Sequence, residues 1–263
     1  MKILVIIGSG RKKGNTSTIA SILLKRINEL AIAEDKQLQV DKLFLVDYEL
    51  KHCLGCRTCM DRGEEKCPLK DDLTKIKAKI DEADAVIFGS PVYIDNVSSM
   101  MKALIDRLAY ICHRQEFYKK MALVYSTSGG SANKHTNRTI AGALLSWGFN
   151  LIGTAGFIIK HHDSDIEIEE KYAKNLDKLA KKVYTSVVNE QYLNPSILSL
   201  AMFKLQQRER ANPEKAHPLD YKYWKEKNWT NPRTNFYINH ESNFLKKVLS
   251  IVVFRTISLL YVN

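Results

Sequence analysis

Short apolar and β-branched runs alternate with longer segments of helical period over about the first 188 of the 263 residues. This alternation is typical of a parallel sheet with helices on both faces, because parallel neighbours need a crossover connection and the crossover helices bury both faces. No internal repeat or low-complexity tract interrupts the pattern. The runs predict five strands, at Lys2 to Ile7, Leu38 to Val46, Asp84 to Tyr93, Met121 to Thr127 and Leu151 to Ile159.

The segments between these runs carry apolar residues three or four positions apart. They predict helices at about Thr16 to Ala33, Asp71 to Ala83, Ser98 to Cys112, Thr136 to Trp147 and Ile166 to Val188. Five strands separated by helices fit a doubly wound α/β fold with the flavodoxin-like strand order 2-1-3-4-5. We therefore expect one α/β domain at residues 1–189 and a helical C-terminal extension at residues 190–263.

The loop after the first predicted strand, GSGRKKGNTST, combines glycines with hydroxyl and amide side chains where a helix begins. A helix N-terminus favours anions through its free amides and its dipole. The loop matches neither G-x-G-x-x-G nor the Walker motif, so a terminal monophosphate such as that of FMN fits better than a nucleotide with magnesium. A glycine-rich turn without a ligand is the alternative. The candidate contacts are Ser9, Arg11, Gly14, Asn15, Thr16 and Ser17.

Two further loops follow the third and fourth predicted strands, and ligands of open α/β sheets bind beyond these strand ends. A flat heteroaromatic ring needs an apolar wall with a few polar contacts at its edge. The loop GSPVYIDNVSSMMK offers that wall, and STSGG offers hydroxyls and unhindered amides for the polar edge of a flavin. The candidate ring contacts are Pro91, Val92, Tyr93 and Asn96 in the first of these loops, and Ser126, Thr127, Ser128, Gly129 and Gly130 in the second.

Four of the five cysteines lie within fifteen residues, spaced C-x2-C-x2-C-x7-C at Cys53, Cys56, Cys59 and Cys67. The N-terminal run MKILVIIGSG predicts a strand and no signal peptide, which indicates a cytoplasmic protein with reduced thiols. Three thiolates at i, i+3 and i+6 can converge on one iron-sulfur cluster, and a fourth closes its coordination. Zinc and free or redox-active thiols are the alternatives. Cys112, in an apolar helical stretch, is expected to be a buried packing residue.

With these motifs the chain resembles the NADPH-dependent FMN reductase branch of the flavodoxin-like superfamily over about residues 1–188. The resemblance rests on GSGRKKGNT, CLGCRTC leading to CPLKDD, ADAVIFGSPVY and MKALIDRL. The cysteine segment looks most like that of the iron-sulfur flavoproteins, which carry FMN and a 4Fe-4S cluster. The resemblance implies phosphate contacts at Ser9, Arg11, Asn15 and Thr16, ring contacts around Pro91, Tyr93 and Asn96, and cluster ligands at Cys53, Cys56, Cys59 and Cys67.

Two classes of function follow from a flavin and a cluster on one sheet edge. The first is an FMN-dependent oxidoreductase, fed by NAD(P)H or ferredoxin, that reduces a small acceptor such as a quinone, free flavin or an oxygen species. It includes a flavin-only FMN or quinone reductase with free cysteines. The second is an electron carrier whose basic surface docks acidic ferredoxins. A binding module without redox chemistry is a third reading. No residue needs to act as a nucleophile or strong base, so no catalytic side chain is predicted, and NAD(P)H would bind only transiently.

The net charge of +11 suits an acidic partner, an anionic membrane surface or nucleic acid. No helix-turn-helix, zinc-finger or RNA-recognition signature appears, so we expect no nucleic-acid partner and interpret most basic residues as solvated surface.

The extension holds eleven of the twenty-four aromatic residues and ends in the apolar stretch SNFLKKVLSIVVFRTISLLYVN. Lys246, Lys247 and Arg255 interrupt this stretch, so no transmembrane helix is expected. A helix this apolar needs a cover. We expect a second subunit to cover it, as an exchanged arm in a homo-oligomer; packing on its own domain and peripheral membrane contact are the alternatives.

Overall fold

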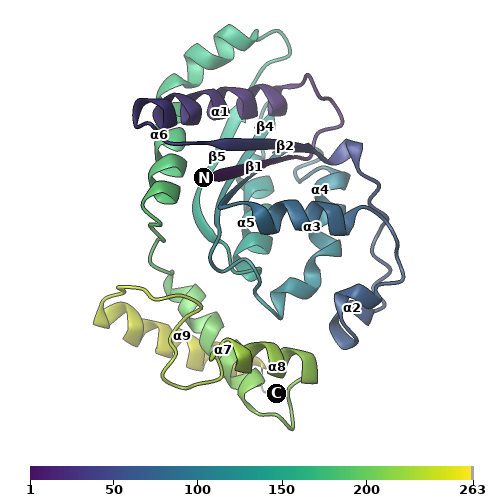
Figure 1. The fold of residues 1–263 in the computed structure, drawn as a ribbon, viewed down its shortest axis with the longest axis vertical. Helices are drawn as coiled ribbons and strands as arrows, with labels where there is room; N and C mark the ends of the chain where they lie inside the picture. The colour runs from purple at the N-terminus through teal and green to yellow at the C-terminus, as the bar shows by residue number, and fades with distance from the viewer. Residues whose placement is uncertain (262–263) are drawn as a thin grey trace.

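The computed structural model describes residues 1–261, in which five parallel strands form one sheet of order β2-β1-β3-β4-β5 (Figure 1). The predicted fold class and strand order are therefore confirmed. The pairing is parallel at every step, with Ile7 opposite Phe44 in β2 and opposite Gly89 in β3. The strands are β1 (Lys2–Ile7), β2 (Gln39–Phe44), β3 (Ala85–Pro91), β4 (Met121–Ser128) and β5 (Asn150–Ile158).

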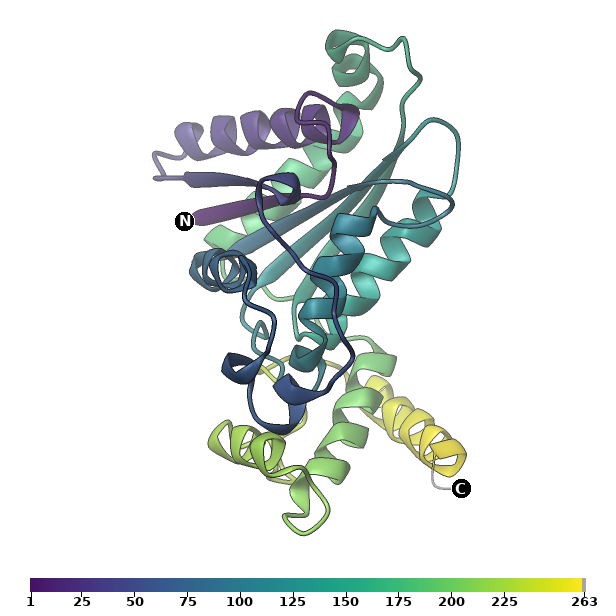
Figure 2. The same cartoon turned by 90° about the vertical axis from the view of Figure 1, so that its right-hand side faces the viewer.

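Helices cover both faces of the sheet (Figure 2). The helices of the α/β unit are α1 (Asn15–Ala33), α3 (Leu73–Glu82), α4 (Ser99–Arg107), α5 (Asn133–Ser146) and α6 (Asp165–Val188). Alternate residues of β1 separate two apolar layers: Ile3, Val5 and Ile7 pack with α1 and α6, whereas Leu4 and Ile6 pack with α3, α4 and α5. Each such buried side chain stabilises the fold by roughly 1.5–3 kcal/mol relative to an exposed one.

The second predicted strand and the helix predicted to reach Cys112 both end in a 3-10 helix. The second strand stops at Phe44, and the 3-10 helix η1 (Leu45–Asp47) follows it. The helix predicted to reach Cys112 is α4 up to Arg107 and then the 3-10 helix η3 (Ala109–Cys112). Cys112 is partly exposed, so the expectation that it is a buried packing residue is wrong. Cys112 does not belong to the apolar layer that buries its neighbour Ile111.

The extension beyond α6 has a small aromatic core of its own. Its helices are α7 (Ile197–Ala211), α8 (Pro218–Glu226) and α9 (Phe244–Tyr261). Phe203, Trp224 and Trp229 are buried together, and Tyr118, from the loop before β4, packs against them. This core joins the extension to the end of the α/β unit at which α4 finishes.

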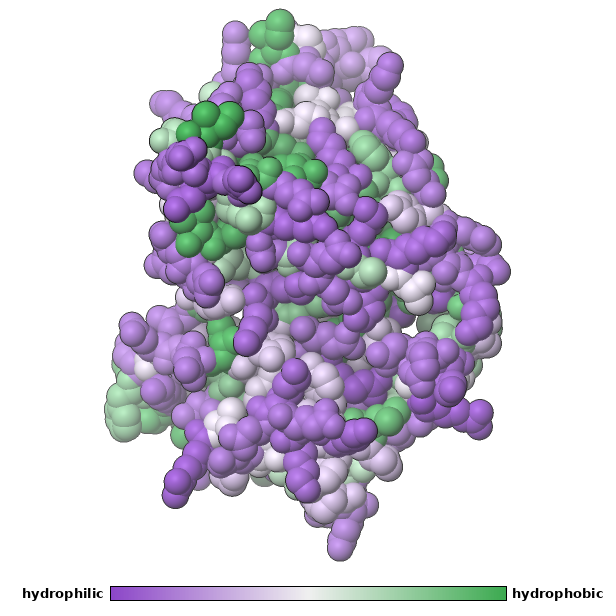
Figure 3. Space-filling model, viewed as in Figure 1, coloured by the Kyte–Doolittle hydropathy of each residue, from purple (hydrophilic) through white to green (hydrophobic). Residues whose placement is uncertain are grey.

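The last helix, α9, packs on α7. Ser250 and Ser258 are buried, and Ser258 accepts a hydrogen bond from Arg208 of α7. Phe244, Leu245 and Leu259, in contrast, are 82%, 64% and 75% exposed. Figure 3 shows the resulting hydrophobic surface at the lower left, where α9 lies in Figure 1. Within residues 1–261 no helix has the length and apolar character to cross a membrane. The expected helix at this end includes Val262 and Asn263, which lie outside the described residues.

Candidate functional site

Thr127 joins the three loops that follow β1, β3 and β4. Its hydroxyl lies 2.7 Å from the hydroxyl of Thr16, and its carbonyl accepts a 2.8 Å hydrogen bond from the amide of Val92. The Tyr125 hydroxyl also donates to the Thr16 carbonyl at 2.7 Å. The topology therefore brings the three candidate loops to one edge of the sheet and fixes them to each other through buried bonds.

The loop between β1 and α1 leaves backbone amides free for an anion. Gly14 is the N-cap residue of α1 and has no side chain to cap the first turn, which contains no acidic residue. Ser9 is buried, and its hydroxyl bonds the backbone of Arg11, which folds the loop over the helix end. Only one of the two hydroxyl protons can lie between Thr16 and Thr127, so the second hydroxyl proton can be donated to a further acceptor. These groups fit a phosphate.

The loop after β3 folds into a tight turn at Tyr93 to Asn96. Their backbones exchange hydrogen bonds of 2.8 and 3.1 Å, and φ is +44° at Ile94 and +64° at Asp95. Positive φ at both central residues is typical of a type I′ turn, which usually has Asn-Gly or Asp-Gly at its centre, and the pair Ile94 and Asp95 does not match that signal. The Asp95 carboxylate lies 2.8 Å from His135 Nδ1 of α5. Tyr93, at the first position of this turn, is 48% exposed, so a ligand could reach its ring.

The predicted contact residues in the loop after β4 fall into two groups. Ser126 and Ser128 both bond the side chain of Asn133, with Ser128 Oγ 2.6 Å from Asn133 Oδ1, so these hydroxyls fix the start of α5. Gly129 and Gly130 are different, since a Cβ at either position would meet no atom within 4 Å. The open backbone of the two glycines is therefore the part of this loop that a ligand can approach.

All four clustered cysteines line one cavity. Cys53 and Cys56 are exposed, while Cys59 and Cys67 are half-buried. Left-handed conformations at Gly55 (φ +65°) and Arg57 (φ +62°) bend the chain around the cavity before the short helix α2 (Thr58–Asp61). Among residues 1–261, no three histidine, cysteine or acidic side chains come close enough to hold a single metal ion.

Local contacts change the acidity of two of these thiols. A hydrogen bond with the Thr58 hydroxyl, at 3.2 Å, lowers the pKa of Cys56 below its ordinary value. Burial raises the pKa of Cys59. The exposed side of the cavity therefore holds the more acidic thiol.

Two buried arginines, which no sequence motif indicated, contact the cysteine segment, and one of them, Arg107, lines the cavity. Arg107, at the end of α4, pairs with Asp71, and its Nη2 lies 3.9 Å from Cys67 Sγ. Burial opposes ionisation of Asp71, but hydrogen bonds from Arg107 hold its pKa below the ordinary value. Arg114 donates a 2.8 Å hydrogen bond to the Cys59 carbonyl. The motifs CPLKDD and MKALIDRL contain the first pair, but nothing in their spacing indicates that the two segments meet.

These contacts also correct the expected position of the cysteines. The cysteine segment begins near the carboxyl end of β2, as expected, but Arg107 donates to the Lys51 carbonyl at 3.0 Å. Lys51 and Cys67 of this segment therefore lie against the last turn of α4. The first turn of α4 instead lies at the three candidate loops after β1, β3 and β4 (the flavin loops), where the Ser98 amide bonds Ser90 Oγ at 3.2 Å. The nine residues of α4 span about 13 Å between the two candidate sites.

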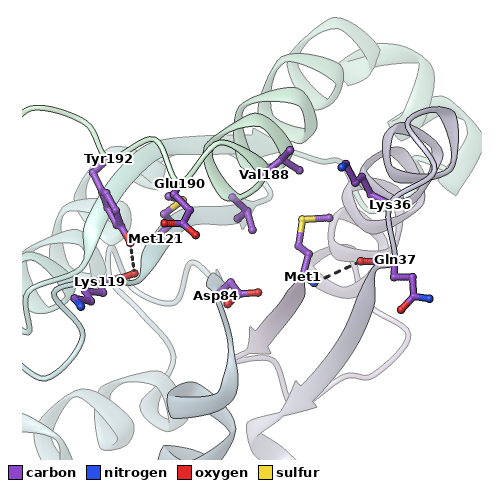
Figure 4. Close-up of a pocket in the computed structure, with 10 residues that line it drawn as sticks. Met1, Lys36, Gln37, Asp84, Lys119, Met121, Val188, Glu190 and Tyr192 are labelled. Atoms are coloured by element: carbon purple, nitrogen blue, oxygen red, sulfur yellow. Dashed lines mark hydrogen bonds between the residues drawn. The ribbon is translucent and has the colours of Figure 1, made fainter.

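A different cavity lies at the opposite edge of the sheet, where strands begin (Figure 4). Met1, Asp84 and Met121 line it where β1, β3 and β4 begin, and Glu190 and Tyr192 line it from the start of the extension. None of the predicted site residues borders it. It is therefore separate from the flavin loops and the cysteine cavity.

Comparisons with known proteins agree with this arrangement. Residues 1–162, more than half of the chain, match the family described as NADPH-dependent FMN reductase. An iron-sulfur flavoprotein of Archaeoglobus fulgidus is 31% identical over 233 residues, covering 86% of this chain and 99% of that protein. An iron-sulfur flavoprotein of Clostridioides difficile is 30% identical over 200 residues, covering 76% of this chain and 84% of that protein.

Among solved structures, RosB with a bound intermediate aligns with a TM-score of 0.54 at 14% identity, covering 93% of this chain and 92% of that one, which is a likeness in fold alone. The matches in sequence, together with the fold, show the family. The chain belongs to the NADPH-dependent FMN reductase family and is an FMN-dependent oxidoreductase of that family.

Proposed function

We propose that the protein binds one FMN at the carboxyl edge of the sheet and one 4Fe-4S cluster in the cysteine cavity, and passes electrons from a donor to a small acceptor. FMN supplies two-electron uptake and single-electron release, and a cluster carries one electron at a time. The observation that carries the proposal is the common cavity of Cys53, Cys56, Cys59 and Cys67 in a chain of this family.

The loop residues have separate tasks in this proposal. The first-turn amides of α1, Arg11 and the free hydroxyl proton of the Thr16–Thr127 pair hold the phosphate. Tyr93 and Pro91 flank the ring, and the open amides of Gly129 and Gly130 bond its polar edge. Ser126 and Ser128 act indirectly, since they position the loop through Asn133.

The cysteine cavity fits a cluster better than zinc. A single zinc ion needs its thiolates about 2.3 Å from one point, and the described residues contain no group that converges so closely. A four-iron cluster is a larger body whose ligands surround it. Four thiols around one cavity match that requirement, and the names of the relatives in Archaeoglobus fulgidus and Clostridioides difficile support it.

The donor and acceptor follow from access to the flavin edge. The exposed Tyr93 side chain leaves this edge open to small molecules, so NAD(P)H would bind transiently there before a small acceptor. A ferredoxin is the alternative donor and would use the basic surface of the chain, whose net charge is +11. Steady-state turnover with NAD(P)H and a quinone separates an enzyme from an electron carrier, which would show little.

A second copy of the chain is the proposed partner of the extension. The apolar side chains that α9 turns outward, Phe244, Leu245 and Leu259 among them, need a cover. Deleting Asn243 to Asn263 should convert an oligomer into monomer or aggregate in light scattering. A full-length protein that is already monomeric would contradict this part of the proposal.

An ultraviolet-visible spectrum with flavin and iron assays on anaerobically purified protein tests the main proposal. We expect about one FMN and, from the composition of such clusters, about four irons per chain. Flavin with background iron and four freely titrating thiols would leave a flavin-only FMN or quinone reductase. The exposed positions of Cys53 and Cys56 are the observation in favour of that second candidate.

A further inference from the structure

Asp220 links the C-terminal extension to the cysteine segment through Arg114. Asp220 belongs to α8 and is 5% exposed. It accepts a 2.8 Å hydrogen bond from Arg114 Nη1 and lies 2.9 Å from His113 Nδ1. Arg114, also 5% exposed, donates from Nη2 to the Cys59 carbonyl at 2.8 Å. A carboxylate more than 150 residues away in the sequence thus reaches the backbone of a proposed cluster ligand through one side chain.

The carbonyl that Arg114 bonds belongs to a helix end. The four-residue helix α2 leaves its last carbonyls without partners inside the helix. Arg114 bonds the carbonyl of Cys59 and lies 3.5 Å from that of Met60. A guanidinium is a rigid, planar fork, so an arginine held at one side by a buried carboxylate fixes the direction of the carbonyl at its other side.

We propose that Asp220 is a positioning residue for the cysteine cavity, holding Arg114 so that the Cys59 peptide aims its thiol into the cavity. This inference deepens the proposed function and rests on it. It gives the C-terminal extension a role at the redox site in addition to any role in assembly.

A comparison with the other arginine shows why the effect is confined to Cys59. Arg107 contacts Cys67 and is paired with Asp71, which lies in the cysteine segment itself. Asp220 is the carboxylate that comes from the extension. Loss of Asp220 should therefore release the Cys59 side of the cavity and leave the Cys67 side in place.

Other contacts keep α8 docked when Asp220 is changed. Trp224 Nε1 donates to the His113 carbonyl at 2.9 Å, and the Tyr223 hydroxyl donates to the Gln115 carbonyl at 3.0 Å. Arg114 also keeps a second acidic neighbour, Glu64, at 3.7 Å. Tyr223→Phe is a matched control, because it removes one hydrogen bond between α8 and the same segment without touching Arg114.

The test compares the full-length parent, Asp220→Asn and Tyr223→Phe. In metal-free protein, mass spectrometry measures the rate at which an alkylating reagent modifies each cysteine. We expect Cys59 to react about tenfold faster in Asp220→Asn, Cys67 to keep its rate, and both to be unchanged in Tyr223→Phe. In anaerobic protein, Asp220→Asn should lose iron to a chelator roughly tenfold faster than the parent and keep the same FMN content. This is the size of effect expected when a group that supports a metal ligand is removed.

Unchanged Cys59 reactivity in Asp220→Asn would overturn the inference, and so would an equal rise at Cys59 and Cys67, which indicates general loosening. Arg114→Lys is the second variant if Asp220→Asn fails to fold, because an ammonium can pair with Asp220 but cannot reproduce the fork. This variant should also increase the alkylation rate of Cys59 and leave that of Cys67 unchanged. A parent with FMN and no iron would overturn the proposed cluster instead, and the alkylation rates would still decide whether Asp220 positions Cys59.

Discussion

The flavin loops and the cysteine segment are held in place by different forces. The three loops are extensions of buried parallel strands and are joined by backbone bonds and the Thr16–Thr127 hydroxyl pair. The cysteine segment leaves the sheet and is held by two buried ion pairs, Arg107 with Asp71 and Arg114 with Asp220. The sheet therefore determines the geometry of the flavin loops, whereas the geometry of the cysteine segment depends on charged residues from distant segments.

This difference predicts different responses to mutation. Breaking a buried ion pair leaves an uncompensated charge and costs more than removing a neutral hydrogen bond. Changes at the arginines should therefore affect stability and the cysteine cavity together. Changes in the flavin loops should affect FMN affinity with a smaller effect on stability.

The largest effect is expected for Arg107→Ala. The Arg107 and Asp71 side chains are 2% and 1% exposed, so the variant leaves Asp71 buried without its partner. We expect a loss of about 3–5 kcal/mol in the free energy of unfolding, measured by urea denaturation. Arg57→Ala removes an exposed pair with Asp61 in the same segment and should leave stability unchanged. Equal stability of the two variants would mean that the cysteine segment does not depend on its buried charges.

Arg11→Ala should weaken FMN binding with little change in stability. Arg11 is exposed on the loop whose amides face the proposed phosphate. A hydrogen bond to a charged group contributes about 1.5–3 kcal/mol, so equilibrium titration should show roughly tenfold to hundredfold weaker affinity. Lys25→Ala is the control on the surface of α1. Parent-like affinity in Arg11→Ala would place the phosphate elsewhere.

Thr127→Val should affect both stability and FMN binding. The variant keeps the side-chain shape but leaves the buried Thr16 hydroxyl without its 2.7 Å partner. We expect a loss of about 1–3 kcal/mol in the free energy of unfolding, together with weaker FMN binding. Thr139→Val, at a hydroxyl on the exposed side of α5, is the matched control. If thermal melts and FMN titrations match those of the parent, the hydroxyl pair does not hold the loops.

The position of the flavin loops at one edge of the sheet was predictable because its signals are local. Apolar runs gave the strands, the parallel strand order placed three loops at one edge, and glycines and hydroxyls marked those loops. The sequence did not distinguish hydroxyls that face a ligand from Ser126 and Ser128, which bond Asn133. The turn at Ile94 and Asp95 was missed because a β-branched residue such as Ile94 does not signal a left-handed backbone.

The surroundings of the cysteines were less predictable because they are made by contacts between distant segments. The spacing of the four cysteines indicated a common site, but Arg107 and Arg114 meet it only after α4 and η3 have packed. Asp220 comes from a helix for which the sequence showed only an aromatic-rich composition. Buried ion pairs between remote segments have no periodicity that a sequence could reveal.

The smallest predicted effect is a dependence of stability on pH through His113, whose side chain is 36% exposed, so solvent screens its pair with Asp220. The hydrogen bond with Asp220 raises the pKa of His113 from 6.5 to about 9 in the folded protein. A group whose pKa is higher in the folded protein than in the unfolded chain stabilises the fold fully at pH values below its unfolded pKa. This contribution is lost as the pH rises through the folded pKa. Asp220 also faces Arg114 and Arg210, but arginines stay charged over this range.

Docking of the extension should therefore weaken between about pH 6.5 and pH 9. The melting temperature should fall across this window in the parent and fall less in His113→Gln, which carries no titrating ring. Limited proteolysis at the two pH values should show faster cleavage in residues 190–261 of the parent at the higher pH. If the melting temperatures of parent and variant changed with pH in the same way, His113 would not contribute to the binding of Asp220, and the arginines alone would hold this carboxylate. The difference between the flavin loops and the cysteine segment would then depend entirely on the buried guanidinium groups.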